Sequence, residues 1–220
     1  MRMRAVLSSV AFVLLLAACL LLPARRLDWP MAWAVLAFYS VYSALGLRLL
    51  SPDLIAERSR LPREAEAADL ALAGLAFVFL YPVSLVVCGL DARGGETPAP
   101  ALAQGTAFLV FAAGYAFALW AAHVNPFFSA AVRIQAERGH HVIDRGPYAW
   151  LRHPGYAGPI ASHLALPLVL GSPRALLPAA LGAVLLTLRA LHEERRLLRE
   201  LPGYAEYTAR VRYRLVPGVW

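Results

Sequence analysis

The feature that decides the fold is an uninterrupted apolar run near the N-terminus, Ala5 to Leu22, which reads AVLSSVAFVLLLAACLLL. A helix of roughly 20 apolar residues crosses the hydrocarbon core of a bilayer, which is about 30 Å thick. Three further segments are long and apolar enough to do the same: Met31 to Leu50, Leu70 to Leu90 and Ala101 to His123. We therefore expect four transmembrane helices in the first part of the chain, residues 1–123.

A fifth apolar region, Gly158 to Leu191, is too long for one span and is interrupted at Gly171 to Arg174. The Gly-Ser-Pro sequence at this interruption favours a turn. The region therefore predicts a helical hairpin with somewhat short arms and with Arg174 at its tip. The expected fold class is an all-α polytopic membrane protein with four transmembrane helices plus a C-terminal helical hairpin.

The composition supports a membrane protein and excludes several other classes. Hydrophobic residues make up 60% of the 220 residues and charged residues 16%, whereas soluble domains average about 45–50% apolar and about 25% charged residues. These values exclude disorder, collagen and a disulfide-stapled domain. The 21 basic residues outnumber the 14 acidic ones, but they flank apolar runs, as charges at a membrane surface do. We expect membrane lipids, and no nucleic acid, as partners.

The arginines predict which side of the membrane each loop faces. If the N-terminus is cytoplasmic, fifteen arginines fall on the inner side and four on the outer side, with Arg48 and Arg189 at span ends. Cytoplasmic loops carry an excess of basic residues. We therefore expect a multi-pass protein, in a bacterial inner membrane, with both termini cytoplasmic. The inner loop from Ser51 to Asp69 has mixed charge, and we interpret it as a solvated amphipathic linker on the lipid headgroups.

Chemistry-bearing residues concentrate after Asn125, in the region 124–220. Gly146-Pro147 is a turn signal, Pro154 disfavours helix at the residue before it, and Pro159 suits the first turn of a helix. A short loop rich in Tyr, Arg and His is thereby set against a membrane helix. Aromatic faces can hold a nucleoside base, and helix-start N–H groups with Arg and His can hold a carboxylate. The alternative is an interfacial aromatic belt.

A second polar cluster lies at the end of the predicted hairpin. Arg189, His192, Glu193 and Arg196 recur at spacings of three and four, which places them on one helix face. A charge within the apolar zone of a membrane costs on the order of 2.5 kcal/mol or more, and ionisable residues kept there usually serve a site. The segment after residue 201 predicts a short amphipathic helix and a basic tail. We expect a cytoplasmic pocket closed by this C-terminal lid, and no metal site, because no metal-binding motif surrounds the histidines.

These residues resemble a known family. The motif Gly-Pro-Tyr-x-x-x-Arg-His-Pro-x-Tyr-x-Gly at 146–158, followed by Arg189 and Glu193-Glu194, is similar to the isoprenylcysteine carboxyl methyltransferase family, which is related to membrane phospholipid methyltransferases. The resemblance covers about the last hundred residues. It implies a methyltransferase that uses S-adenosylmethionine, in a catalytic region at 124–220 that comprises a cofactor loop, the hairpin and the lid.

The resemblance also implies roles for individual residues. Arg189 would bind the substrate carboxylate and so align it for catalysis, and Glu193 would bind the cofactor, through its amino group. The remaining cofactor-binding residues would come from the loop and the start of the hairpin: Gln135, His140, His141, Val142, Ile143, Tyr148, His153, Pro154, Gly155 and Tyr156.

The sequence leaves open the methyl acceptor and, with it, the class of enzyme. A carboxylate is already deprotonated at pH 7 and needs only alignment with the methyl group, so a lipidic, isoprenylcysteine-like carboxylate is the first expectation. A phospholipid or small-molecule N- or S-methyltransferase with the same cofactor pocket is the nearest alternative. Membrane reductases that use a nicotinamide cofactor are a further one, although their motif usually has an acidic residue where this chain has Pro159.

Overall fold

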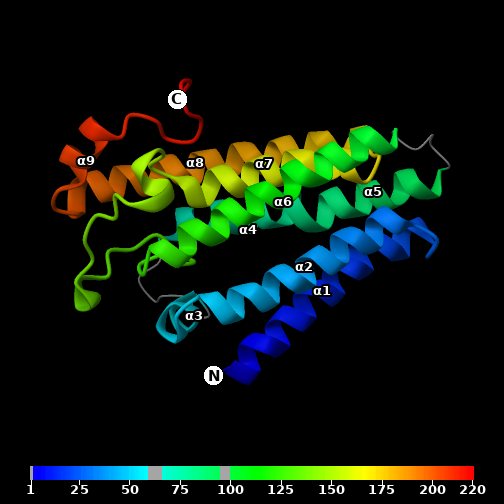
Figure 1. Cartoon of the computed structure of the whole chain (residues 1–220), viewed down its shortest axis with the longest axis horizontal. Helices are drawn as coiled ribbons and strands as arrows, with labels where there is room; N and C mark the ends of the chain where they lie inside the picture. Colours follow the sequence, from blue (N-terminus) through cyan, green and yellow to red (C-terminus); the bar gives the residue numbers. More distant parts are fainter. Residues whose placement is uncertain (1, 59–65, 95–99) are drawn as a thin grey trace.

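The structure is a computed structural model that describes residues 2–58, 66–94 and 100–220 (Figure 1). Within these ranges every regular element is helical. Parts of the expected inner loop, including Arg60 and Arg63, and of the loop between the third and fourth spans lie outside the described residues. The all-α class predicted from hydropathy is confirmed for the described part of the chain.

Among the described residues, five helices are long and apolar enough, by length and composition, to cross a membrane. The first four correspond to the predicted spans: α1 (Arg2–Ala24), α2 (Pro30–Leu49), the helical stretch Ala67–Arg93 and α6 (Ala101–Val124). The fifth candidate is Pro173–Glu200. A short helix, α3 (Pro52–Arg58), follows α2.

The third span is one helical stretch with a local widening. It consists of α4 (Ala67–Val78), a π-helical turn η1 (Phe79–Val83) and α5 (Ser84–Arg93). Pro82 lies inside this turn and has no N–H for the helical ladder, and a π turn is a common way to accommodate such a break. The Ser84 hydroxyl donates a hydrogen bond to the Phe79 carbonyl at 2.7 Å, so the widened turn gains a side-chain bond.

The predicted hairpin is present, but its arms are unequal. The first arm, α7 (Pro154–Val169), starts directly after His153, and Gly171 turns the chain with a φ of 72°. After the short turn η4 (Pro173–Ala175), α8 (Leu176–Glu200) runs far beyond the apolar region. The apolar arm predicted for α8 was short, and the helix is longer because it continues through its charged residues, as their helical spacing predicted.

Close backbone contact fixes α7 against α6. A Cβ atom added at Gly114 would collide with the Ser162 hydroxyl and the Gly158 carbonyl, and one at Gly158 would collide with the Gly114 carbonyl. The two glycines therefore allow the helices to lie side by side (Figure 1). This packing holds the start of α7, where the sequence motif ends, in a defined place.

The buried centre of the bundle contains a hydrogen-bonded chain of polar side chains. The Tyr115 hydroxyl lies 3.0 Å from that of Tyr39, 2.9 Å from that of Tyr81 and 2.9 Å from Nε2 of His163. Buried polar groups are costly unless they are paired. The three tyrosine hydroxyls and Nε2 of His163 pair with one another and join α2, the third span, α6 and α7.

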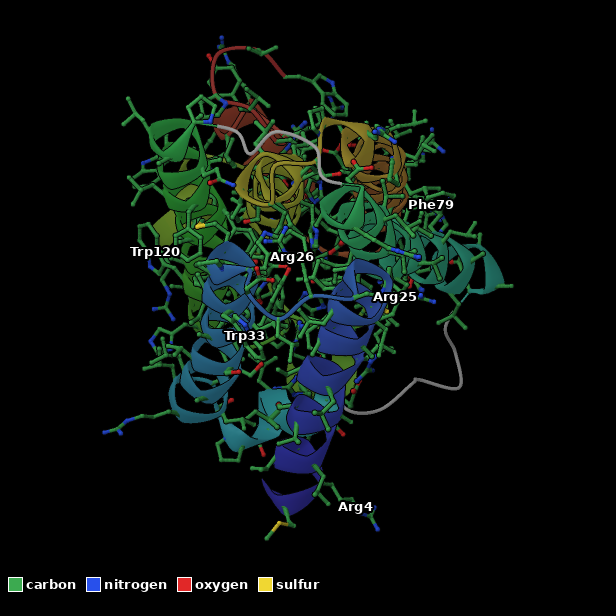
Figure 2. The ribbon with its side chains drawn as sticks, turned by 90° about the vertical axis from the view of Figure 1, so that its right-hand side faces the viewer. Arg4, Arg25, Arg26, Trp33, Phe79 and Trp120 are labelled. Carbon is green, nitrogen blue, oxygen red and sulfur yellow. The ribbon has the colours of Figure 1, made fainter. Side chains whose placement is uncertain are left out.

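The loops divide between the two ends of the bundle. Figure 1 shows α3, the loop after α6, the C-terminal helix α9 (Tyr204–Arg210) and the N-terminal end of α1 toward one end. Figure 2 looks onto the other end, where Arg25 and Arg26 lie in the turn between α1 and α2. The elements predicted to be cytoplasmic are thus grouped together, and the predicted outer turn is opposite them.

Candidate functional site

A cavity of about 390 Å³ lies at the end of the bundle that carries α3 and α9. Its walls come from α4, from the loop between α6 and α7, from the start of α7, and from α8 and α9. Ligand pockets of roughly 300–1,000 Å³ are typical for small molecules and cofactors. The cavity is therefore large enough to be a binding site, and the two polar regions singled out in the sequence meet in it.

Most of the residues predicted for the site line this cavity. They are His140, His141, Val142, Ile143, Tyr148, His153, Gly155, Tyr156, Arg189 and Glu193. Gln135 and Pro154 are not in the wall. Gln135 is fully buried, donates a hydrogen bond to the Phe127 carbonyl at 2.8 Å and accepts one from Arg138, and Pro154 begins α7. Gln135 thus holds the loop by hydrogen bonds, and Pro154 is where the loop ends and α7 begins.

Tyr156 lies beside both Glu193 and Arg189. The Tyr156 hydroxyl donates a 2.6 Å hydrogen bond to Oε2 of Glu193, and the Arg189 guanidinium lies 5.8 Å from the centre of the Tyr156 ring. The Tyr156 hydroxyl fixes the Glu193 carboxylate, whereas the Arg189 guanidinium only lies near the ring and is fixed by Asp69. Each charged group is thereby held at the cavity wall, on successive turns of α8.

Asp69 is a site residue that sequence reasoning missed. Its side chain is 0% exposed and accepts two hydrogen bonds from Arg189, Nε to Oδ1 at 2.7 Å and Nη2 to Oδ2 at 3.2 Å. The backbone N–H of Val132 donates a third, at 2.9 Å. Nη2 of Arg189 also donates to the Ala130 carbonyl at 2.7 Å. A signal was available in the sequence, since Asp69 stands at the start of an apolar span, where charges are expensive.

Most of the described inner loop is exposed, as a solvated linker would be, but that interpretation is wrong for Glu57 and Asp69, which are mostly or fully buried. Glu57 accepts hydrogen bonds from Nε and Nη2 of Arg133 at 2.9 and 3.0 Å, and one from the Ser129 hydroxyl at 3.1 Å. The Arg133 hydrogen bonds and charge hold the pKa of Glu57 below its usual value. Mixed charge suggested exposure to water, but the carboxylates bind basic residues of the cavity wall.

Glu66 makes a similar contact farther along the chain. Its carboxylate lies 3.0 Å from Nε2 of His192 and 3.6 Å from Nη1 of Arg196, and Nη1 of Arg196 also donates to the Val132 carbonyl at 2.9 Å. Together with Asp69 and Glu57, Glu66 ties the first half of the chain to the loop and to α8. The predicted cofactor loop is therefore held by acidic residues of the first half of the chain.

Two imidazoles in the wall, the buried His153 and the partly buried His140, are kept neutral. Burial, with the charges of Arg152 and Arg214, lowers the pKa of His153 to about 3. Burial, followed by the charges of His141 and Arg133, lowers the pKa of His140 to about 4. The His140 ring stacks on Phe127 with 4.4 Å between ring centres. At pH 7 both rings are neutral polar surfaces of the cavity.

Among the described residues of the wall, the buried polar atoms without a hydrogen-bond partner include Nε2 of His153, Nδ1 of His163 and the hydroxyl of Tyr204. Such atoms are rare, since leaving one unpaired costs about 1–3 kcal/mol. Their position in the cavity wall favours pairing with a bound molecule. Within the described part of the chain, no group of three or more His, Cys, Asp or Glu side chains is arranged to hold a metal ion.

The C-terminal segment covers the loop. The Tyr207 hydroxyl on α9 donates to the Tyr148 carbonyl at 2.7 Å, and the N–H groups of Arg152 and His153 donate to the carbonyls of Tyr213 and Arg214 at 2.9 and 3.0 Å. Glu194 lies 2.9 Å from Nε of Arg152 and accepts a 2.5 Å hydrogen bond from Arg214, side chains of the loop and of the tail. Of the segment predicted to be a lid, Tyr204 and Tyr207 line the cavity, and Tyr213 and Arg214 contact the loop.

Comparison with known proteins connects this site to a family. Residues 106–199 match the model of the isoprenylcysteine carboxyl methyltransferase (ICMT) family. A search of curated protein sequences found no match to the chain. The matched segment runs from α6 to α8 and contains every site residue predicted from the motif, and the family indicates a membrane methyltransferase. Residues 106–199 are therefore similar to the ICMT family, as the motif within them predicted.

Proposed function

We propose that the protein is an integral membrane methyltransferase that uses S-adenosylmethionine to O-methylate the carboxylate of a lipidic, isoprenylcysteine-like acceptor. The observation that carries the proposal is the cavity in which Glu193 and Arg189, four residues apart on α8, both line the wall with Tyr156 beside them. A negative group for the cofactor and a positive group for the acceptor within one cavity are what methyl transfer between these molecules requires.

The residues of the cavity fit the cofactor chemically. Glu193 offers a carboxylate to an amino group, the His140 ring stacked on Phe127 offers an aromatic surface to a base, and His153 offers an unpaired ring nitrogen. When bound, S-adenosylmethionine supplies a methyl group on a positively charged sulfur. The lid residues Tyr204 and Tyr207 contribute to the same wall, which limits the access of water.

The protonation state of the wall favours a carboxylate acceptor. An amine must lose a proton before it can attack, and a useful general base has a pKa near the working pH. Burial lowers the pKa values of His153 and His140 to about 3 and about 4, so neither imidazole accepts a proton readily at pH 7. A carboxylate needs no base, and Arg189 supplies a permanent positive charge to align it.

The apolar part of the cavity supports a lipidic acceptor. Ala73, Ala76, Phe77 and Leu80 of the third span line it, together with Leu186 of α8. Phe77 and the neighbouring Leu75 and Val78 also expose apolar surface on the outside of the helix. An apolar tail can reach this wall from the bilayer between helices, while its acidic end lies at Arg189. With the predicted sidedness, the cavity opens toward the cytoplasm.

Ligand titration tests the proposal. The detergent-purified protein should bind S-adenosylmethionine and S-adenosylhomocysteine, and it should not bind NADPH. Circular dichroism of the same sample checks that it is folded. A folded protein that binds NADPH, or that binds neither adenosyl compound, contradicts the methyltransferase assignment and, in the first case, supports a reductase.

A further inference from the structure

The cavity wall contains more positive charge than the proposed function uses. Five arginines line it: Arg58, Arg133, Arg152, Arg189 and Arg196. Four of them lie within ion-pair distance of carboxylates, namely those of Glu57, Glu194, Asp69 and Glu66 respectively. Within the described part of the chain, Arg58 has no such carboxylate partner. Its guanidinium is the cavity charge that the described protein does not balance.

Arg58 comes from outside the segment that matches the family. It is the last residue of α3, which lies at the same end of the molecule as the loop (Figure 1). Its guanidinium lies 4.9 Å from the centre of the Phe128 ring, and its Nη1 makes a long contact of 3.5 Å to the Phe128 carbonyl. These contacts place the cation but use little of its hydrogen-bonding capacity, since a guanidinium has five N–H donors.

Arg58 and Arg189 are held on the same short segment of the loop. Arg58 contacts Phe128, and Nη2 of Arg189 donates to the carbonyl of Ala130, two residues later. Two residues of extended chain span at most roughly 7 Å. Loss of hydration lowers the pKa of Arg58, and the positive charge of Arg189 lowers it further. A bound anion would therefore relieve the repulsion between these two cations.

The contacts of Arg189 leave it unable to grip a carboxylate with two nitrogens. Its Nε and both hydrogens of Nη2 are used by Asp69 and the Ala130 carbonyl. The Nη1 donors have no partner among the described residues. A planar two-nitrogen contact with a carboxylate requires a neighbouring pair of nitrogens, and Arg189 has only one nitrogen to offer. A second cation is needed for strong recognition of an acid.

From these observations we infer that Arg58 is a second acceptor-binding residue, and that the acceptor's carboxylate is bound between Arg58 and Nη1 of Arg189. Asp69 holds Arg189 in position, and its negative charge offsets the positive charge of Arg189. The positive charge of Arg58 is then left to pair with the single negative charge of the acceptor's carboxylate. This inference rests on the proposed function and assigns the acid selectivity of the acceptor site to two arginines, one of them from the first half of the chain.

Comparing an acid with its methyl ester tests the inference. S-farnesylcysteine, with its amino group acylated, would be used as the free acid and as the methyl ester, and binding of each would be measured in competition with the other. Arg58→Gln should reduce the preference for the acid on the order of tenfold, the size expected for one charge-assisted hydrogen bond. Its affinity for S-adenosylhomocysteine should stay unchanged. Arg195→Gln, an exposed α8 variant outside the cavity wall, is the matched control and should behave like the wild type.

The possible outcomes separate this inference from the proposed function. An Arg58→Gln variant that keeps its acid preference, or that loses affinity for S-adenosylhomocysteine instead, overturns the assignment of Arg58 while the methyltransferase proposal stands. Failure of the wild type to bind S-adenosylhomocysteine overturns the proposed function itself. Arg58→Lys, which keeps the charge but not the planar donor group, should retain part of the preference for the acid. If both arginines bind one carboxylate, the double variant Arg58→Gln, Arg189→Gln should lose less acid affinity than the sum of the losses in the two single variants.

Discussion

At the residue scale, the site divides its charges between two ligands. Glu193 is held by Tyr156 and Arg189 is held by Asp69, so each charged group has a support that does not depend on the other. A change at one of them should therefore affect one ligand and spare the other. The structure makes this division testable with substitutions that keep shape and remove charge.

Glu193→Gln should weaken S-adenosylhomocysteine binding at least tenfold, because the amide keeps the Tyr156 hydrogen bond but loses the charge that pairs with an amino group. Arg189→Gln should keep that affinity and lose methyl transfer to the acid. Calorimetry and a transfer assay measure the two effects, with Glu206→Gln on α9 as the control. An equal loss of cofactor affinity in the Glu193 and Arg189 variants would show that the roles are wrongly divided.

The neutral histidines predict how stability depends on pH. Their usual pKa is 6.5, and burial lowers it to about 3 for His153 and about 4 for His140. Between these values and 6.5 the unfolded chain binds more protons than the folded one, so stability is full above about pH 6.5 and falls as the pH drops.

The midpoint of thermal unfolding in detergent should therefore be lower at pH 5.5 than at pH 7.5. His153→Asn should reduce the difference between the two midpoints, and replacement of the exposed His141 by Asn should leave it unchanged. A wild-type midpoint that does not change over this range would contradict the neutral state of both rings.

At the scale of the elements, the carboxylates of α3 and of the start of the third span hold the loop between α6 and α7. Glu57 binds Arg133 and Ser129, and Asp69 binds Arg189 and Val132. The regular structure described within this loop is two short 3-10 helices, Ala136–Arg138 and Gly146–Ala149, so the loop gains little order from its own backbone. The first half of the chain is therefore part of the site as well as a membrane anchor.

Glu57→Gln should loosen this loop, because it removes the charge that two Arg133 nitrogens bind in a mostly buried pair. We expect a loss on the order of 1–3 kcal/mol in local stability, seen as faster hydrogen exchange of residues 129–134. Asp53→Asn, an exposed position on the same helix, is the control. Unchanged exchange in the Glu57 variant would mean that the pair does not order the loop.

The elements also show what the sequence could predict. The spans and the hairpin follow from hydropathy, because the bilayer sets the length of each apolar run. The site residues after Asn125 were found through their motif. Asp69, Glu57 and Arg58 were not singled out, because their partners lie 60 residues or more away in sequence, and local patterns do not report such pairings.

At the scale of the whole molecule, the two ends of the bundle differ in chemistry. The cavity, the loop and the C-terminal wall share one end, and the turn between α1 and α2 lies at the other (Figures 1 and 2). The arginine distribution predicts that the cavity end is cytoplasmic. A cofactor made in the cytoplasm and a tail dissolved in the bilayer would then reach one cavity from two directions.

Cysteine labelling tests this orientation. In a Cys19→Ala background, with the fully buried Cys88 retained, Asp28→Cys in the turn between α1 and α2 should react with an impermeant thiol reagent on intact cells. Glu206→Cys on α9 should react only after permeabilisation. The reverse pattern would place the cavity on the outside and would contradict the positive-inside prediction.

The most direct test of the central claim is the chemistry of the product. The purified protein would be incubated with methyl-labelled S-adenosylmethionine and S-farnesylcysteine acylated on its amino group, and the product would be treated with mild base. A methyl ester releases its label as methanol, and this is the result we predict. Label that stays in a base-stable product would show N- or S-methylation, and the absence of any labelled product from a folded protein that binds the cofactor would contradict carboxylate methylation of this acceptor.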